Sequence, residues 1–167
     1  MTLMSPSEMV DHLDDQGAVV GAVTRKEMRA QNLRHRAVAV VVVSSRNEVL
    51  VHRRADWKDL WPSRWDLAFS GVVVAGEAWE DAASRELFEE AGVHAALEYL
   101  GEDAYDDDHV RELARVYLAR SDGPFTHTDG EVTETAWVPL RELCAWVAHH
   151  ELCPDNVALV PPRLDSP

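Results

Sequence analysis

The sequence predicts an α/β fold in which a mixed β-sheet lies between helices. Strand-like and helix-like segments interleave along the chain, without the regular strand–helix–strand period of a fully parallel sheet. The run Ala37–Val43 is apolar at every position, as expected of a central strand that is buried on both faces. With 167 residues, 46% of them hydrophobic, the chain is long enough for one domain with a sizeable core.

The first half of the chain is predicted to contain strands and one short helix. Two apolar segments flank Gly17, and this pattern favours a hairpin. Thr24 and Glu27 have the spacing of a capping box, which predicts the start of a short helix. The strands AVAVVVVSS and EVLVHRR follow, and a loop over residues 55–64 leads into the strand WDLAFSG.

The second half is predicted to contain a long helix, two strands and a C-terminal helix. The long helix runs roughly over Trp79–Ala91, and Gly92 stands at the position of a C-terminal cap. LARVYLAR and ETAWVPL are predicted strands, and PLRELCAWVAHH is a predicted helix with Pro139 in its first turn. We therefore expect one domain over residues 9–160, with flexible termini at 1–8 and 161–167.

Charge and cysteine content argue against several classes of function. The net charge of −14 argues against nucleic-acid polymers as partners, because these bind to basic surfaces. The two cysteines, Cys144 and Cys153, are too few for a disulfide framework or a cysteine-rich zinc cluster. The sequence has neither a secretory signal pattern nor an apolar run of membrane-spanning length. We expect a soluble cytoplasmic protein without a membrane partner, and its oligomeric state, a homodimer included, stays open.

Three glutamates share one face of the predicted long helix. Glu86, Glu89 and Glu90 lie at positions i, i+3 and i+4, where like charges destabilise a helix by roughly a few tenths of a kcal/mol per pair. The negative C-terminal end of the helix adds to this cost. Because Arg85 cannot balance all three charges, the pattern indicates either a solvated acidic face or a bound cation.

The segment that contains this helix, GVVVAGEAWEDAASRELFEEAGV, resembles the Nudix box. Every required position of that motif is filled, by Gly71, Glu77, Arg85, Glu86, Leu87, Glu89, Glu90, Gly92 and Val93. The resemblance implies a Nudix-type α/β/α sandwich and a divalent cation, Mg²⁺ or Mn²⁺ in its place, that supplies the missing positive charge. The ligands that it implies are Glu86, Glu89, Glu90 and the backbone carbonyl of Ser70.

The other positions of the box are interpreted as structural supports of the site. Gly71 lets the backbone approach the metal, and Gly92 ends the helix. Arg85 is interpreted as an ion-pair partner that orients Glu77 or a helix glutamate within the catalytic set, rather than as a contact of the substrate.

The resemblance implies hydrolysis of a nucleoside diphosphate that is linked to another group. Bound metal ions polarise the diphosphate and activate a water molecule that attacks phosphorus. Glu89 or Glu90 could accept the proton of this water, but the later segment THTDGEVTETAWV offers Glu131 and, as second choice, Glu134. The alternative for the two later glutamates is an exposed position without a role in catalysis.

Basic and aromatic residues outside the box are candidates for binding the substrate. Arg53 and Arg54 end a strand and Lys58 follows in the loop, and such cations suit phosphate groups. Because neighbouring residues of a strand point to opposite faces, at most one of the two arginines faces the site. Trp57 or Trp61 could stack on a base.

The resemblance extends over about residues 9–146 to the Nudix branch that contains isopentenyl diphosphate isomerase and its hydrolase-like relatives. The isomerase uses a cysteine where this chain has Ser70, and a histidine-rich metal site of which His35 and Glu112 could supply two ligands. Met28 and Val72 stand where that metal site needs further ligands. A serine hydroxyl is too weak an acid to replace a thiol in proton transfer to an alkene.

Hydrolysis is therefore preferred to isomerisation as the predicted reaction. A third alternative is a Nudix module that binds a nucleotide without catalysis. Such modules often lack glutamates of the box, whereas this sequence has all of them. We predict a metal-dependent hydrolase that acts on a small-molecule diphosphate.

Overall fold

The strand β3 (His35–Val43) is the element around which the structure is built. In the computed structural model, which describes residues 5–164, every residue of β3 from Ala37 to Val43 is buried. Alternate side chains enter two hydrophobic clusters, one containing Ala37, Ala39, Val41 and Val43, the other Val38, Val40 and Val42. The run is apolar throughout because both faces of the strand are covered.

The sheet around β3 is mixed. Its strand order is β5-β4-β3-β8-β7, with β6 paired to β3 and β9 paired to β4. The other strands are β4 (Glu48–Arg54), β5 (Trp65–Asp66), β6 (Phe69–Val72), β7 (Leu97–Asp106), β8 (Arg111–Arg120) and β9 (Val132–Pro139). β8 runs parallel to β3 along its whole length, and the other paired strands of this sheet are antiparallel. The central position predicted for β3 is confirmed.

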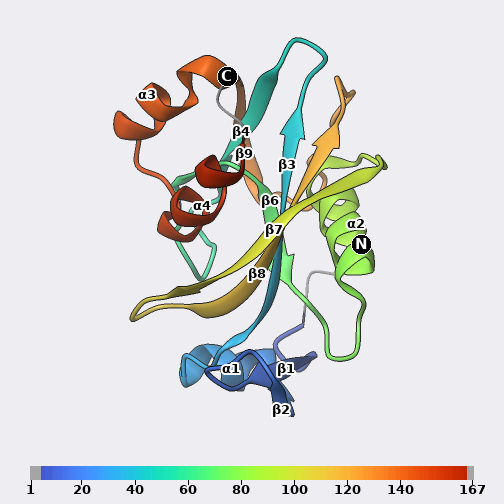
Figure 1. The fold of residues 1–167 in the computed structure, drawn as a ribbon, viewed down its shortest axis with the longest axis vertical. Helices are drawn as coiled ribbons and strands as arrows, with labels where there is room; N and C mark the ends of the chain where they lie inside the picture. Colours follow the sequence, from blue (N-terminus) through green and yellow to red (C-terminus); the bar gives the residue numbers. More distant parts are fainter. Residues whose placement is uncertain (1–4, 165–167) are drawn as a thin grey trace.

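Helices cover both faces of this sheet (Figure 1). On one face lies α2 (Trp79–Ala91), which packs through its small and apolar side chains Ala82, Ala83, Leu87 and Ala91. On the opposite face lie α3 (Leu143–Ala148) and α4 (Pro154–Leu159), whose residues Leu143 and Leu159 join the other cluster. The predicted α/β/α sandwich is thus confirmed.

A small N-terminal unit lies at one end of the sheet, at the bottom of Figure 1. It consists of the antiparallel strands β1 (Met9–Leu13) and β2 (Val19–Thr24), followed by the helix α1 (Arg25–Ala30). The turn between the strands contains Gly17 at a φ of 81°, a conformation that favours glycine. The hairpin predicted at this position is therefore present.

Two contacts fix α1 in this unit. The Thr24 hydroxyl accepts a hydrogen bond of 3.2 Å from the Glu27 amide, which is the predicted N-terminal cap. Met28 of α1 and Val10 of β1 form a small apolar cluster with Val72 of β6. This packing places one face of α1 beside the end of β6, close to the first residues of the Nudix-box segment.

The edge strand β7 has no counterpart among the predicted strands. All of its residues are at least partly exposed, so its sequence lacks the alternation of buried apolar residues that identifies a strand. A register shift between Tyr99 and Gly101 interrupts the period of two still further.

The C-terminal helix predicted over PLRELCAWVAHH is wrong in both of its limits. Pro139 is the last residue of β9, a 3-10 turn follows at Leu140–Glu142, and α3 ends at Ala148. The unpredicted helix α4 then begins at Pro154, a residue that suits a first helical turn because it has no amide hydrogen to donate.

The C-terminal residues that the structure describes are packed against the domain. Pro161–Arg163 form a 3-10 turn, and Leu164 is buried in the cluster beneath α3 and α4. Arg163 Nη2 lies 3.3 Å from Asp103 Oδ2 of β7. These contacts involve residues 161–164 of the tail predicted for 161–167, and both the flexible tail and the domain limits of 9–160 stay predictions.

Part of the predicted N-terminal tail is also hydrogen-bonded. The Glu8 carbonyl accepts the Arg25 amide at 2.8 Å, and the Pro6 carbonyl accepts the Lys26 amide at 3.0 Å. The rest of both predicted tails, residues 1–4 and 165–167, lies outside the described residues. None of the helices within residues 5–164 is both long and apolar enough to cross a membrane.

Candidate active site

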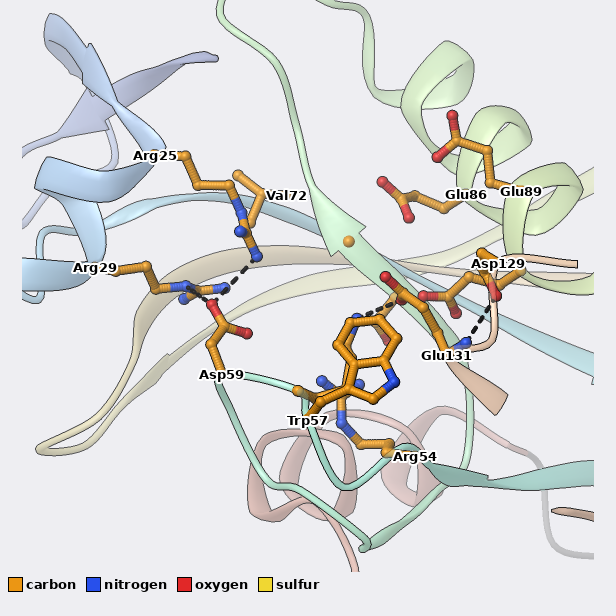
Figure 2. Close-up of a pocket in the computed structure, with 14 residues that line it drawn as sticks. Arg25, Arg29, Arg54, Trp57, Asp59, Val72, Glu86, Glu89, Asp129 and Glu131 are labelled. Atoms are coloured by element: carbon orange, nitrogen blue, oxygen red, sulfur yellow. Dashed lines mark hydrogen bonds and ion pairs between the residues drawn. The ribbon is translucent and has the colours of Figure 1, made fainter. Parts of the chain in front are cut away.

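A pocket of about 290 Å³ lies where α1, α2, the loop after β4 and the segment before β9 meet. Figure 2 shows Arg25 and Arg29 on the side of the pocket opposite Glu86 and Glu89, with the acid Asp59 beside the two arginines. Five acids line one side: Glu86, Glu89, Glu90, Asp129 and Glu131. Four cations also line the pocket: Arg25, Arg29, Arg54 and Lys58. The predicted helix glutamates therefore meet residues from distant parts of the chain.

The helix glutamates differ in their burial. Glu86 and Glu90 are only 6% and 5% exposed, whereas Glu89 is partly exposed. Burial raises the pKa of Glu86 to about 7, although Arg85 partly offsets this effect. Burial, followed by the nearby Glu86, raises the pKa of Glu90 well above its usual value, and burial also raises the pKa of Glu89. The site thus disfavours the ionised forms of the three helix glutamates.

Arg85 joins the helix to the loop that precedes it. Its Nε and Nη2 each donate to one oxygen of Glu77 at 2.9 Å, a bidentate pair. Its Nη1 donates to Glu86 at 2.5 Å and to Glu89 at 3.5 Å. The hydrogen bonds with Glu77 are the main reason that the pKa of Arg85 is raised above its usual value. In this arrangement Arg85 orients carboxylates.

The backbone of β6 passes directly beside the Glu86 carboxylate. A Cβ at Gly71 would overlap that carboxylate, so only glycine permits this close approach. The adjacent Ser70 also lines the pocket, and its hydroxyl accepts a hydrogen bond of 3.1 Å from Asn156 of α4. At the other end of the box, Gly92 has a φ of 69° and ends α2.

The two glutamates of the later segment occupy different environments. Glu131 lines the pocket and forms an ion pair with Lys58. Burial alone would raise the pKa of Glu131, but Lys58 holds it below its usual value. The Glu134 side chain is 57% exposed and lies 3.9 Å from Arg53, outside the pocket lining. The structure brings Glu131, but not Glu134, to the helix glutamates.

Arg53 and Arg54, which are adjacent in β4, also occupy different environments. Arg54 lines the pocket, and its guanidinium is held by the Leu60 carbonyl at 3.1 Å and by Asp66 at 3.3 Å. Arg53 is 47% exposed, donates to the Ser63 carbonyl at 2.9 Å and lies outside the pocket lining. Because side chains alternate between the two faces of a strand, only one of these two arginines faces the pocket.

One of the two candidate stacking residues is at the pocket. Trp57 lines it and is 55% exposed. Trp61 is absent from this lining and packs edge-to-face against His109, with ring centroids 5.3 Å apart.

Four further pocket residues had no signal in the sequence that connects them to the box: Arg25, Arg29, Asp59 and Asp129. Asp129 is part of an Asp-Gly turn, a pattern that could have marked it as a loop residue. Its carboxylate accepts the Glu131 amide at 2.9 Å, and burial raises its pKa. The two arginines come from α1, and only the tertiary fold brings them here.

The donor set of the acidic side suits a hard divalent cation, because it consists of carboxylate oxygens beside a closely approaching backbone. Within residues 5–164, no three His, Cys, Asp or Glu side chains are already arranged to hold a metal ion. Arg85 occupies one oxygen of Glu86 in this arrangement. The residues nevertheless fit such an ion, since three helix carboxylates line the same pocket as Ser70 and Gly71, and the backbone at Gly71 lies directly at the Glu86 carboxylate.

The residues that correspond to the isomerase metal site are in a different environment. Met28 and Val72 contact each other in an apolar cluster, so neither offers a metal ligand. His35 is buried, which lowers its pKa to about 3 and keeps the imidazole neutral at neutral pH.

Glu112 leads to a prediction about stability and pH. Burial, followed by the nearby Asp155, raises its folded-state pKa to about 8, against about 4.3 in an unfolded chain. Between these values the folded protein retains a proton that the unfolded chain has lost, so this group's contribution to stability falls as pH rises. Well above pH 8 both the folded and the unfolded chain have lost this proton, so the contribution of Glu112 to stability no longer changes with pH. Glu112→Gln removes this loss and is expected to stabilise the protein at pH 9 by about 1–4 kcal/mol.

Urea unfolding at pH 5 and pH 9 tests this expectation. The gain of Glu112→Gln over the natural chain should largely vanish at pH 5, where the carboxyl is protonated in the folded state. Glu98→Gln, on the exposed side of β7, is the matched control and should show no such pH-dependent gain. An equal effect of Glu112→Gln at both pH values would contradict the assigned pKa.

Comparison with known proteins agrees with this geometry. The family model of the NUDIX domain matches residues 33–160. A Nudix hydrolase of Salmonella typhi, YfcD, is 34% identical over 156 residues, which cover 92% of this chain and 83% of that protein. These matches span most of the chain.

Two solved structures share the fold. A protein from Deinococcus radiodurans has a TM-score of 0.81 at 24% identity, covering 95% of this chain and 100% of that one. The NUDIX domain of NrtR from Shewanella oneidensis, in complex with ADP ribose, has a TM-score of 0.61 at 21% identity, covering 83% and 95%. Together with the complete box and the matched domain, these findings show that the chain belongs to the Nudix family and is a Nudix hydrolase.

Proposed function

We propose that this Nudix hydrolase is a Mg²⁺-dependent enzyme that cleaves the diphosphate bond of a nucleoside diphosphate linked to another group, or of a related organic diphosphate. The observation that carries the proposal is the group of five acids in one pocket, of which Glu86 and Glu90 are buried with raised pKa values. Buried like charges are costly unless a counter-charge is bound. A divalent cation supplies that charge and attracts a diphosphate as well.

In the proposed site, Glu86, Glu89, Glu90 and the Ser70 carbonyl hold the cation. A bound ion would supply Lewis-acid chemistry there, stabilising negative charge on the diphosphate and activating water. Mn²⁺ is expected to substitute for Mg²⁺, since both prefer oxygen ligands. Arg85 keeps the helix carboxylates in position through its bonds to Glu77 and Glu86.

Glu131 is the residue to which we assign proton removal from the attacking water. Lys58 keeps its pKa low despite burial, so its carboxylate is ionised at neutral pH. Glu90, which is hydrogen-bonded to Glu131, has its pKa raised. Two neighbouring carboxyl groups whose pKa values are pushed apart are typical of acid–base sites. Glu89 is the second choice for this role.

Two observations support a nucleotide as part of the substrate. Trp57 presents an exposed ring at the pocket, where it could stack on a base. The NUDIX domain of NrtR, which has the same fold, binds ADP ribose, a nucleoside diphosphate linked to a sugar.

Product release from a substrate panel tests the proposal. The panel contains ADP ribose, other sugar nucleotides, dinucleoside polyphosphates, coenzyme A and nucleoside di- and triphosphates, each with Mg²⁺, with Mn²⁺ and with excess chelator. At least one compound is expected to be hydrolysed with either metal and none in chelator. Full activity in excess chelator would refute the proposal that hydrolysis depends on a metal ion.

The same preparation separates the two alternative functions. Isomerisation would exchange protons of isopentenyl diphosphate with deuterated water, and exchange retained after repurification would overturn the hydrolase proposal. Saturable nucleotide binding without turnover of any panel compound would favour a non-catalytic module. We expect no exchange, because Met28 and Val72 form an apolar cluster where the isomerase needs metal ligands.

Metal binding is also expected to stabilise the folded protein. A ligand at ten times its dissociation constant adds about 1.4 kcal/mol, which for a chain of this size raises Tm by about 3–6 °C. Thermal unfolding in Mg²⁺ and in chelator measures the shift. The double variant Glu86→Gln/Glu90→Gln should lose it, whereas Glu98→Gln should retain it. An unchanged Tm of the natural chain in saturating Mg²⁺ would contradict a metal site that exists in the folded state.

A further inference from the structure

Two arginines of α1 project into the pocket from the side opposite the helix glutamates. Figure 2 shows Arg25 and Arg29 converging on Asp59, away from Glu86 and Glu89. The two arginines are one helical turn apart, a spacing at which like charges repel. Each has one guanidinium nitrogen 3.3 Å from the same oxygen, Asp59 Oδ2. Two cations therefore share one carboxylate.

The nearby Glu112 does not supply the second negative charge that two arginines would need. Glu112 acts on Arg29, but its pKa of about 8 keeps it mostly protonated at neutral pH. The arginine pair is also poorly solvated: burial, together with the like charge of the neighbouring Arg25, lowers the pKa of Arg29 despite Asp59. The pair therefore retains excess positive charge in a partly buried position.

Nitrogen donors of both Arg25 and Arg29 lack a hydrogen-bond acceptor within the described part of the chain. Arg25 Nε and Arg29 Nη1 are buried and have no hydrogen-bond partner among residues 5–164. By contrast, Arg54 donates to Leu60 and Asp66, and Lys58 is paired with Glu131. Buried donors without acceptors are costly, so this side of the pocket is suited to a ligand that has several anionic oxygens.

We propose that Arg25 and Arg29 bind a phosphoryl group of the substrate that is additional to the diphosphate bond cleaved at the carboxylate side. The substrates preferred would then be nucleotides or organic diphosphates with a further phosphoryl group, over those that end in an uncharged sugar. This inference rests on the proposed function for the identity of the substrate. It does not need the metal, because guanidinium groups bind phosphate oxygens directly.

The pair also comes from an unexpected part of the chain. The matched NUDIX domain covers residues 33–160, whereas α1 ends at Ala30. The N-terminal unit of β1, β2 and α1 thus adds two cations to a pocket whose acids come from the domain itself. Substrate selection in this protein would depend on a segment that precedes the matched domain.

A substitution at Asp59 distinguishes a phosphate-binding role of the two arginines from a purely structural one. Its carboxylate competes with a phosphate for the same guanidinium groups, so Asp59→Asn should make phosphate bind more tightly. A purely structural pair predicts the opposite sign, since losing the shared carboxylate would only loosen α1. Arg25→Gln and Arg29→Gln should each weaken phosphate binding by at least about fivefold.

The first measurement is calorimetric binding of inorganic phosphate in excess chelator, so that neither metal nor turnover is involved. Arg141→Gln is the matched control, because this arginine is 78% exposed and pairs only with its neighbour Glu142 among described residues. Thermal unfolding of each variant verifies that it is folded. No saturable phosphate binding by the natural chain, or weaker binding by Asp59→Asn, would overturn the inference.

The second measurement separates a phosphoryl group of the substrate from free phosphate. Affinities are compared for ADP and ATP, and for dephospho-coenzyme A and coenzyme A, again in chelator. In at least one pair, the natural chain should bind the member with the extra phosphoryl group at least about fivefold more tightly, and Arg29→Gln should abolish this preference. Equal affinities within both pairs, with phosphate still bound, would assign the arginines to free phosphate and refute the substrate role. Absence of hydrolysis would refute only the proposed function.

Discussion

Replacing Glu86, Glu89 or Glu90 singly by Gln is expected to reduce turnover at least about tenfold, a loss of about 1.4 kcal/mol of transition-state stabilisation. Glutamine keeps the size of the side chain but removes the charge that attracts a divalent cation. The largest loss is expected for Glu90, which is buried and hydrogen-bonded to Glu131. The smallest is expected for Glu89, which is the most exposed of the three.

Steady-state kinetics of the best panel substrate over a range of Mg²⁺ concentrations checks this expectation. Asp81→Asn is the matched control, since it removes one charge from an exposed position on the same helix. Thermal unfolding in chelator separates loss of function from loss of fold. The Gln variants at positions 86 and 90 should be folded, because burying a neutral amide is less costly than burying a carboxylate. Near-normal turnover of all three variants would refute the metal site.

Gly71→Ala is expected to have the second large effect, on both activity and stability. The new Cβ would overlap the Glu86 carboxylate, so either the backbone of β6 or the carboxylate must move. Overpacking of this kind costs about 1–3 kcal/mol, which corresponds to a decrease in Tm of about 2–12 °C for a chain of this size. A displaced Glu86 would also lose its position as a metal ligand, so activity should fall by at least about tenfold.

Gly21→Ala is the control for this prediction. Gly21 also lies in a strand, and a Cβ there would meet no atom within 4 Å, so the variant should keep both its Tm and its turnover. The two variants differ only in the space that surrounds the added methyl group. If Gly71→Ala is as stable and as active as the natural chain, the close approach of β6 to Glu86 is not required for the site.

Features that depend on neighbouring residues in the chain were determined by the sequence alone. The alternation of β3 between two hydrophobic clusters requires an unbroken apolar run, and this run predicted the central strand. The helix α2 has the predicted limits, and its C-terminal limit follows from Gly92, which ends it in the left-handed conformation. The shared face of the box glutamates follows from the helical period in the same way. Such local signals failed for β7, which is largely exposed, and for the split C-terminal helices.

Features of the site that join distant segments were decided only by the tertiary structure. The strand period allowed one of Arg53 and Arg54 to face the pocket, but the packing of the sheet selected Arg54. Glu131 was already preferred to Glu134, and the path of the chain before β9 places it beside Lys58. Arg25 and Arg29 lie more than 40 positions before the box segment and reach the pocket because Met28, on the same short helix, packs against Val72. The physical reason is that a local pattern specifies which face a side chain occupies, whereas burial of apolar surface between elements specifies what that face meets.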